Sequence, residues 1–293
     1  MPHPEHKQFR PRRRSRLKQA IAAFWCLGLA LLSLPILGSF SGIGQTAPPP
    51  PPTLSPALEQ TLAKLPPLAV HPLPPALAQW QDPDRKGDYF DQVQPAIVGA
   101  LIWSDFPLKL YVAPLTPQEQ AIPFRQQQAQ TWLTAVQRAI QEWQAYFPLE
   151  LVEQASQADI QIGRSPLPLR LDKTSNTRPT RGFALPRARS AETRFEFYAQ
   201  PQPNGRSRLS HRMKIAIRPD QAIDYLQAAA RHELGHAFGI WGHSPQPTDA
   251  LYFSQVRQPA AISARDLNTL KKIYQQPTRL GWELPAIAPA QSP

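Results

Sequence analysis

The chain has 293 residues, which is enough for one domain of medium size with additional segments. Its formal charge is +11, but about half of the excess positive charge lies before Ala20, so the charge gives little support for nucleic-acid binding and we expect no nucleic-acid partner. Cys26 is the only cysteine in the sequence, which excludes an intrachain disulfide.

Residues 1–19 form a basic, polar tail, and residues 20–40 are almost wholly apolar. An apolar run of about twenty residues can cross a bilayer as a helix. The positive charge before this run favours a cytoplasmic N-terminus, with the rest of the chain outside the cytoplasm. The run is either a cleaved signal peptide, which would make the protein secreted or periplasmic, or an uncleaved single-pass anchor. Its length slightly favours the anchor.

Residues 41–87 are rich in proline, with an unbroken run at 48–52. Proline removes amide donors and favours extended backbone, so we expect a semi-rigid spacer rather than an inhibitory pro-segment. A short helix near residues 58–65 is the one regular element that this segment could hold. A globular domain is predicted over residues 88–278. Residues 279–293 form a C-terminal tail that we expect to be partly disordered.

The first half of the domain shows one long helix among short strands. Residues 108–112 alternate between apolar and polar side chains, which predicts a strand. Residues 126–147 carry apolar side chains at helical spacing and end before Pro148, so they predict a long amphipathic helix whose tryptophans belong to the core. Two more strands are predicted at 149–152 and 159–162.

The second half begins with a basic stretch at 163–192, which we expect to form irregular, solvated loops. Strands are predicted at 193–199 and 213–217, followed by a helix with Asp220 as its N-cap. A capping box at 263–266 begins a C-terminal helix. This order predicts an α/β fold of the α+β type, with a twisted, mixed, five-stranded sheet, a long backing helix, a helix after residue 220 and a C-terminal helix.

A short motif that begins in the predicted helix after residue 220 contains three histidines. Residues 232–244 read H-E-L-G-H-A-F-G-I-W-G-H-S. His232 and His236 are four residues apart, which stacks their side chains on one face of a helix, where they can bind one tetrahedral zinc ion. Glu233 can lean over the same metal without ligating it and accept a proton from a zinc-activated water.

A third ligand requires the chain to turn back after the helix. Gly239 can adopt the left-handed conformation that ends a helix at little steric cost, and His243 then comes within reach of the metal. Three histidines leave a fourth position open for water, which is typical of catalytic zinc sites. The alternative is a set of histidines on an ordinary helix. The pattern H-E-x-x-H alone arises by chance in about one chain in a hundred, but the added glycine and third histidine make chance far rarer.

The motif resembles the zinc signature of the metzincin metallopeptidases, H-E-x-x-H-x-x-G-x-x-H, over a domain of roughly residues 95–278. His243 comes one residue late because Gly242 intervenes, and a loop accommodates an extra glycine easily. Metzincins carry a methionine turn beneath the histidines, and the matching residue here is Leu251, which has a similar volume. The C-terminal helix is what the matrixin-like branch implies.

The resemblance implies a zinc endopeptidase that binds one catalytic Zn²⁺ and acts on a protein or peptide substrate. The substrate would pair with the edge strand at 193–199, with Tyr252 and Phe253 beside the scissile bond or else packed in the core. Asp249 is a substitute third ligand if His243 does not serve. Calcium sites built from loop carbonyls stay open. We expect a monomer, attached to the membrane through its N-terminal segment.

The sequence leaves two alternatives from other functional classes. One is a catalytically inactive, peptidase-like module that binds peptide or cell-wall polymer, for which Leu251 and Gly242 are the only support. The other is a membrane-tethered structural protein with a proline-rich stalk. This alternative does not explain why three histidines lie so close together. A thiol that blocks the metal is excluded as a latency mechanism, because Cys26 lies within the apolar run.

Overall fold

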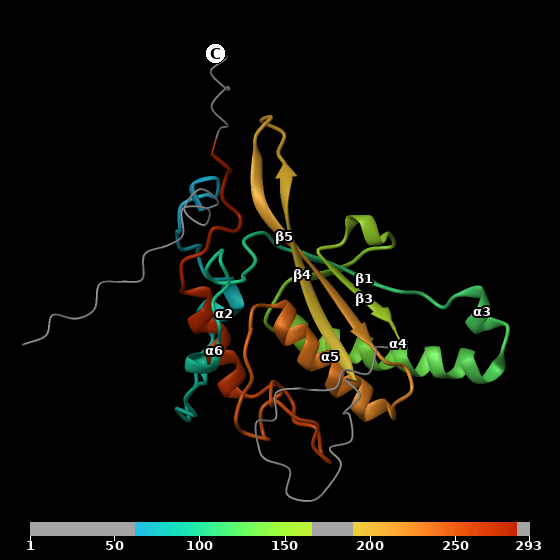
Figure 1. Cartoon of the computed structure of the whole chain (residues 1–293). Coiled ribbons are helices and arrows are strands. Elements are labelled where there is room, and N and C mark those ends of the chain that lie inside the picture. The colour runs from blue at the N-terminus through green and yellow to red at the C-terminus, as the bar shows by residue number, and fades with distance from the viewer. Residues whose placement is uncertain (1–61, 166–189, 286–293) are drawn as a thin grey trace, which may run out of the picture. The chain divides into compact units, whose positions relative to one another are not determined.

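The computed structural model describes residues 62–165 and 190–285 (Figure 1). The basic tail, the apolar run at 20–40 and the proline run at 48–52 lie outside the described residues, as do 166–189 and 286–293. Within the described part of the chain, no helix has both the length and the apolar character needed to span a bilayer.

A single mixed sheet of five strands runs through the domain, as predicted (Figure 1). The strand order is β2-β1-β3-β5-β4, with all neighbours parallel except the antiparallel pair β4 and β5. The strands are β1 (Leu108–Val112), β2 (Leu149–Leu151), β3 (Ile160–Arg164), β4 (Ala191–Pro201) and β5 (Ser207–Ile217). The strand predicted at 193–199 therefore lies at an edge of the sheet, as β4.

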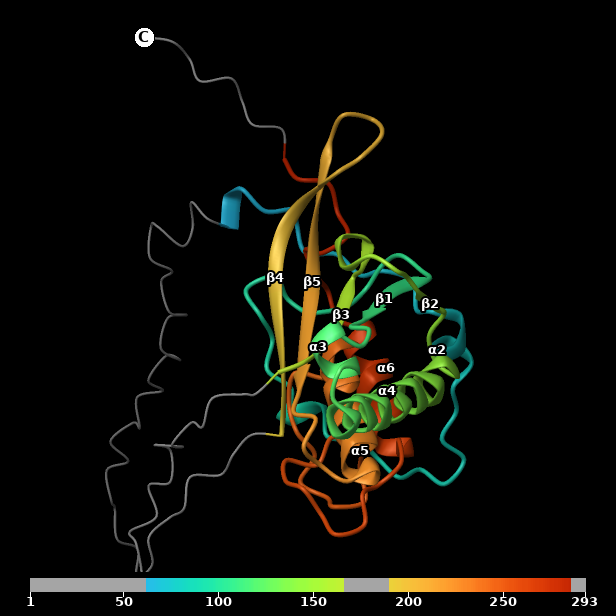
Figure 2. The same cartoon turned by 90° about the vertical axis from the view of Figure 1, so that its right-hand side faces the viewer.

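The hairpin of β4 and β5 is longer than predicted. It pairs continuously from Ala191 opposite Ile217 to Pro201 opposite Ser207. Its outer half projects past the end of β3, which Figure 2 shows from the side. The prediction for β5 began only at Met213 because the residues before it are mostly polar, and the residues that they contact on the side away from β4 are the distant 281–284.

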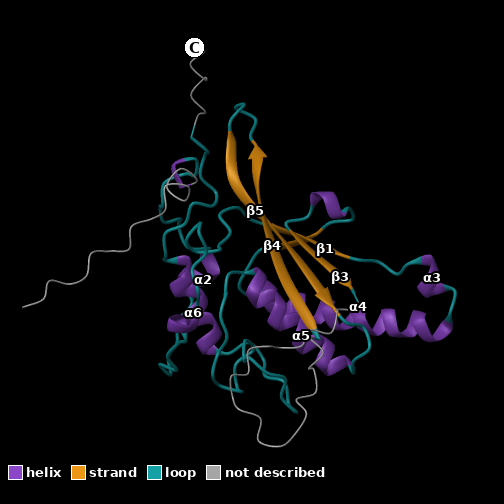
Figure 3. Cartoon of the chain, in the orientation of Figure 1, coloured by secondary structure: helices purple, strands orange, loops and turns teal. Residues whose placement is uncertain are grey.

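Three long helices match the predicted ones, with shifted boundaries. They are α4 (Pro123–Gln144), α5 (Ile223–Ala237) and α6 (Ala264–Tyr274), shown in Figure 3. Ser263 and Asp266 form the predicted capping box of α6. The predicted N-cap Asp220 is wrong, because α5 begins after Ala222 with no side-chain cap. Asp220 instead accepts hydrogen bonds from the guanidinium of Arg218.

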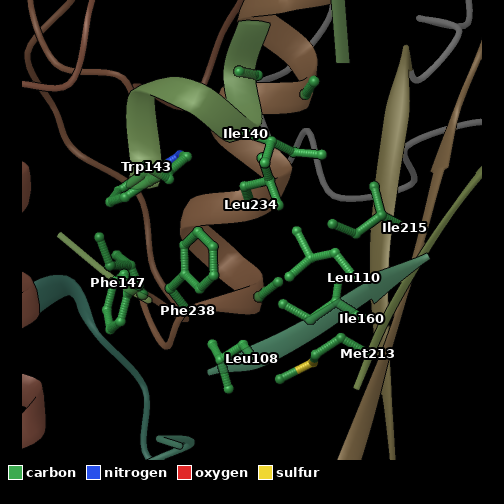
Figure 4. Packing of buried hydrophobic residues seen from close by; sticks show 14 of the residues in the cluster. Leu108, Leu110, Ile140, Trp143, Phe147, Ile160, Met213, Ile215, Leu234 and Phe238 are labelled. Carbon is green, nitrogen blue, oxygen red and sulfur yellow. The ribbon is translucent and has the colours of Figure 1, made fainter. Parts of the chain in front are cut away.

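The main core lies between the sheet and the helices α4 and α5 (Figure 4). Trp132 and Trp143 of α4 are fully buried, as expected for core residues. In Figure 4 the side chains of α4 and α5 face those of β1, β3 and β5. Burying one side chain such as Leu or Phe contributes about 1.5–3 kcal/mol to stability. This packing fixes the orientation of α5, and therefore of the histidines that it carries.

The packed structure begins before residue 88, where the domain was expected to start. Leu77 in the short helix α2 (Pro75–Gln79) is fully buried, and Trp80 Nε1 donates a 2.9 Å hydrogen bond to Asn268 of α6. Pro75 occupies the first turn of α2, where its missing N–H costs nothing. The semi-rigid spacer predicted for residues 41–87 is therefore the wrong interpretation for the described residues 62–87, which pack against the domain.

The first part of the predicted tail is also packed rather than disordered. Residues Ala69 and Thr278 exchange two backbone hydrogen bonds, of 3.1 and 2.9 Å. Leu280 is 2% exposed, and the ring of Trp282 stacks on His71 with centroids 4.1 Å apart. The two ends of the described chain thus pack together beside the outer half of the hairpin.

Candidate metal centre

The last two turns of α5 and the loop after it bring the three predicted histidines together. The Nε2 atoms of His232 and His236 lie 3.1 Å apart. The ring of His243 has its centroid 5.3 Å from that of His232 and 4.9 Å from that of His236. One nitrogen from each ring lies within 4.8 Å of the other two, which suits ligation of a single zinc ion.

Backbone carbonyls orient two of the imidazoles. His232 Nδ1 lies 2.9 Å from the carbonyl oxygen of Ala250, and His236 Nδ1 lies 2.6 Å from that of Ile240. When Nδ1 donates to a carbonyl, the lone pair is on Nε2, where it can bind a metal. Burial, together with the neighbouring imidazoles, lowers the pKa of both histidines to about 4. Both rings are therefore neutral at pH 7, as metal binding requires.

Two glycines shape the loop that returns His243. Gly239 has a φ of +128°, and a Cβ there would lie 2.8 Å from the carbonyl oxygen of Leu101. Gly242, the inserted residue, abuts the 3₁₀ helix η1 (Phe90–Gln92), and a Cβ there would lie 2.2 Å from the carbonyl oxygen of Gln92. The insertion is thus accommodated by a close backbone contact that only glycine permits.

The turn beneath the histidines contains Leu251. Leu251 is fully buried, and a Cβ on Gly235 of α5 would lie 2.6 Å from its side chain. The carboxylate of Asp266 fixes this turn by accepting hydrogen bonds from the backbone nitrogen of Ala250 at 2.9 Å and from the hydroxyl of Tyr89 at 2.5 Å. Burial raises the pKa of Asp266, although its hydrogen bonds act in the opposite direction.

Asp249, the substitute third ligand, belongs to a different network. Its carboxylate accepts hydrogen bonds from the hydroxyl of Ser244 and, at 3.0 Å, from Nε of Arg265. Among the described residues, the group that could hold a metal consists of the three histidines alone. Asp249 therefore supports the loop after His243 rather than joining the metal group.

Glu233 is only 7% exposed and belongs to the same turn of α5 as the histidines. Its Oε2 atom accepts a 2.5 Å hydrogen bond from the hydroxyl of Thr193 in the edge strand β4. Sequence reasoning placed Thr193 in a strand but gave it no role. No sequence signal could reveal this contact, because it joins a strand and a helix that are far apart in the chain.

A pocket of about 160 Å³ opens beside His232 and Glu233. Tyr252 and Phe253 both line it, and Phe253 is 63% exposed. The lining also includes small and apolar residues, namely Ala228, Ala229, Val256, Pro259 and Ala260.

Two aromatic rings pack next to the second histidine. The ring of Trp241 stacks on His236 with centroids 5.9 Å apart, and Phe195 of β4 meets Trp241 edge-on at 4.9 Å. His243 itself is exposed. Phe195 of the edge strand β4 is thus connected to the second histidine through the ring of Trp241.

The comparison with protein families agrees with this geometry. The family model described as matrixin matches residues 119–275, which is more than half of the chain and includes all three histidines. A search of curated proteins found no match. The matched region spans β2 to β5 and the helices α4, α5 and α6, while β1 and the packed N-terminal segment lie before it. From this match and the three-histidine group together, we conclude that the chain belongs to the matrixin family of zinc metallopeptidases.

Proposed function

We propose that the chain is a zinc endopeptidase in which Glu233 is the general base. The observation that carries this proposal is the position of Glu233, a buried carboxylate on the same helix turn as two of the three histidines. Bound Zn²⁺ would supply a Lewis acid that lowers the pKa of water and polarises a carbonyl. The residues that would hold it are His232, His236 and His243.

The protein residues carry out the proton transfer and orient the base. Glu233 accepts the proton of the attacking water and passes it to the leaving amine. Thr193 holds one carboxylate oxygen of Glu233 through its hydroxyl, which keeps the base in a fixed orientation. Because the side chain of Glu233 is buried, little reorganisation is needed when substrate covers the cleft.

We place the substrate as an extended peptide along the edge strand β4. An edge strand offers unpaired backbone groups to which a peptide can add as another strand. The apolar wall formed by Ala228, Val256 and Pro259 suits an apolar side chain next to the scissile bond, beside Tyr252. Phe195 and Trp241 offer an aromatic surface further along the cleft.

The test is Glu233→Gln, assayed together with metal content. The variant should keep one zinc per chain while its cleavage of casein falls by about 10²–10⁴-fold, which is the usual contribution of a general base. Asp224→Asn, at an exposed position in the first turn of the same helix, is the matched control and should retain full activity. Cleavage at the wild-type rate by Glu233→Gln would show that the base is another group.

A second measurement separates the enzyme from a binding module. In a casein zymogram, the wild-type protein should give a cleared band that a chelator abolishes and that added zinc restores. A zinc-loaded, folded protein that clears no band with any of several protein substrates would instead favour the inactive, peptide-binding alternative.

We further propose that the domain acts outside the cytoplasm, anchored by residues 20–40. This proposal rests on the sequence alone, namely the basic tail before an apolar run, since both segments lie outside the described residues. In intact cells, external protease should digest a tag placed at the C-terminus. A tag protected until the membrane is lysed would contradict this orientation.

A further inference from the structure

A second pocket, of about 560 Å³, shares no lining residue with the pocket beside the histidines. Its walls come from the loop 102–107, Lys109 of β1, residues 156–159 just before β3, the outer half of the β4–β5 hairpin and residues 280–281. We call it the notch pocket. It is larger than the pocket at the metal centre, and the proposed peptidase mechanism does not use it.

The notch pocket lies at an interruption of the sheet. Met213 of β5 donates a 2.8 Å backbone hydrogen bond to Asp159, at the point where β3 begins. Four residues earlier, Leu209 donates a 2.9 Å bond to Trp282 and accepts a 2.7 Å bond from Gly281. Between these two connections, the stretch of β5 around His211 has β4 on one side and no described strand on the other.

Two buried side-chain nitrogens of residues lining this pocket lack a hydrogen-bond partner among the described residues. One is Nε2 of His211, a residue that is 3% exposed and stacks on Trp103 with ring centroids 3.8 Å apart. The other is Nε of Arg212, whose guanidinium lies 4.9 Å from the ring centroid of Tyr198. Nearly all buried polar groups have a partner, so a ligand in the pocket could supply one to these two nitrogens.

Among the cations around the notch pocket, Arg212 is the one whose guanidinium can still donate hydrogen bonds to a ligand. Arg208 already forms an ion pair with Asp105 and donates a 2.9 Å hydrogen bond to Gln200. The guanidinium of Arg212 has a 3.7 Å contact with Glu196, which is too long for a hydrogen bond, and it interacts electrostatically with Asp159, which also lines the pocket. Its planar guanidinium fork matches the geometry of a carboxylate.

His211 adds a neutral group to the lining of the pocket, on the opposite face of β5 from Arg212. Burial lowers the pKa of its imidazole to about 3, so the ring is uncharged at pH 7. A neutral imidazole has one donor and one acceptor, and an amide group can satisfy both. The interruption beside β5 also offers the backbone edge that an extended peptide uses to bind a sheet.

We propose that the notch pocket binds a carboxylate of an acidic peptide, with Arg212 holding the carboxylate and His211 contacting the neighbouring amide. The binding is independent of catalysis, because no residue of the pocket belongs to the metal centre. In a peptidase, such a site would retain acidic proteins or a peptide C-terminus at a distance from the cleft.

The test is calorimetric titration of the full-length, zinc-loaded protein with three capped tripeptides. Acetyl-Glu-Glu-Glu-amide presents side-chain carboxylates only, acetyl-Gln-Gln-Gln presents a terminal carboxylate only, and acetyl-Gln-Gln-Gln-amide presents none. At least one carboxylate-bearing peptide should bind ten or more times more tightly than the uncharged one, and the stronger of the two identifies the source of the carboxylate. Mass spectrometry of the recovered peptides confirms that they are intact.

Variants then locate the binding. Arg212→Gln and Arg212→Lys should each weaken the preferred peptide about tenfold or more, because neither retains the guanidinium fork. His211→Phe, which preserves the ring stack on Trp103, should weaken it several-fold. Lys214→Gln is the matched control, on the same face of β5 but outside the pocket lining, and should leave affinity within about twofold.

Three results would overturn the proposal. They are equal affinity for charged and uncharged peptides, no binding of any peptide at millimolar concentration, and a loss in Lys214→Gln as large as that in Arg212→Gln. Circular dichroism and zinc content of each variant show whether it is folded. The separate Arg212→Lys substitution keeps the test valid if His211→Phe does not fold.

Discussion

The carboxylate of Asp266 accepts a 2.9 Å hydrogen bond from the backbone nitrogen of Ala250. The carbonyl of Ala250 in turn lies 2.9 Å from Nδ1 of His232. One residue of the turn therefore connects helix α6 to the first metal ligand. Outer groups of this kind orient metal ligands and tune their affinity.

Asp266→Asn should therefore lower both stability and metal affinity. The amide cannot accept from all the donors that surround the buried carboxylate, so we expect a loss of about 3 kcal/mol in the free energy of unfolding. Zinc affinity should fall about tenfold or more. Urea denaturation and chelator competition measure the two effects. Asp84→Asn, at an exposed site, is the control. Unchanged zinc affinity in a folded Asp266→Asn would show that the turn orients His232 without Asp266.

Thr193→Val tests the hydroxyl that holds Glu233. The change removes the 2.5 Å hydrogen bond to the carboxylate and keeps the shape and strand preference of the side chain. A hydrogen bond to a charged group is worth about 1.5–3 kcal/mol, so we expect kcat to fall about tenfold or more with KM and zinc content nearly unchanged.

Thr193→Ser separates positioning from packing at the same site. It restores the hydroxyl without the methyl group and should recover most of the lost kcat. If Thr193→Ser is as slow as Thr193→Val, the methyl contacts matter and the hydrogen bond to Glu233 does not.

Gly242→Ala tests the contact that holds the His243 loop. A Cβ at this position would lie 2.2 Å from the carbonyl oxygen of Gln92, so the loop or η1 must move. We expect a loss of about 1–3 kcal/mol in stability, which is typical of overpacking, together with weaker zinc binding. Gly163→Ala, where the added methyl group meets open space, is the control. Equal zinc affinity in the two variants would mean that the loop tolerates the displacement.

Glu119→Gln should reduce stability in a pH-dependent way. The guanidinium of Arg164 hydrogen-bonds to Glu119 and lowers the pKa of that carboxyl from 4.5 to about 2. Because the folded value lies below the unfolded one, this contribution is complete above pH 4.5 and disappears as the pH falls toward 2. Glu119 is partly exposed, so the effect at pH 7 should be about 1 kcal/mol or less.

The measurement is urea denaturation of both proteins between pH 3 and pH 7. The gap in stability between wild type and Glu119→Gln should narrow as the pH decreases. A gap that stays constant over this range would show that the ion pair with Arg164 does not act through the charge of Glu119.

The sequence by itself determined the metal group, because that group is local. The helical repeat places His232 and His236 on one face, and Gly239 ends the helix so that His243 can return. The apolar and polar alternation within short segments similarly predicted strands, and the resemblance to metzincins implied that 193–199 is an edge strand. Each helix and strand leaves a periodic pattern in the residue types, because its side chains repeat with the local backbone geometry.

The sequence missed features that depend on distant parts of the chain. The proline-rich residues before 88 pack on α6 because Leu77 and Trp80 find buried partners there, and composition alone does not show this. The outer half of β5 is mostly polar, so the sequence did not indicate a strand there. In the structure it forms backbone hydrogen bonds with residues 281–284, which are far away in the chain. Asp220 resembled an N-cap but pairs with Arg218 instead.

Only the tertiary structure decided how the metal group is supported. Thr193 reaches Glu233 across 40 positions of sequence, and Asp266 reaches the turn under His232 from another helix. The backbone of Gln92, which lies before the region that matches the matrixins, presses on Gly242 beside the third ligand. Each is a single contact between a side chain or carbonyl and a distant segment. Such contacts follow from the packing of whole elements, which no local pattern of residue types encodes.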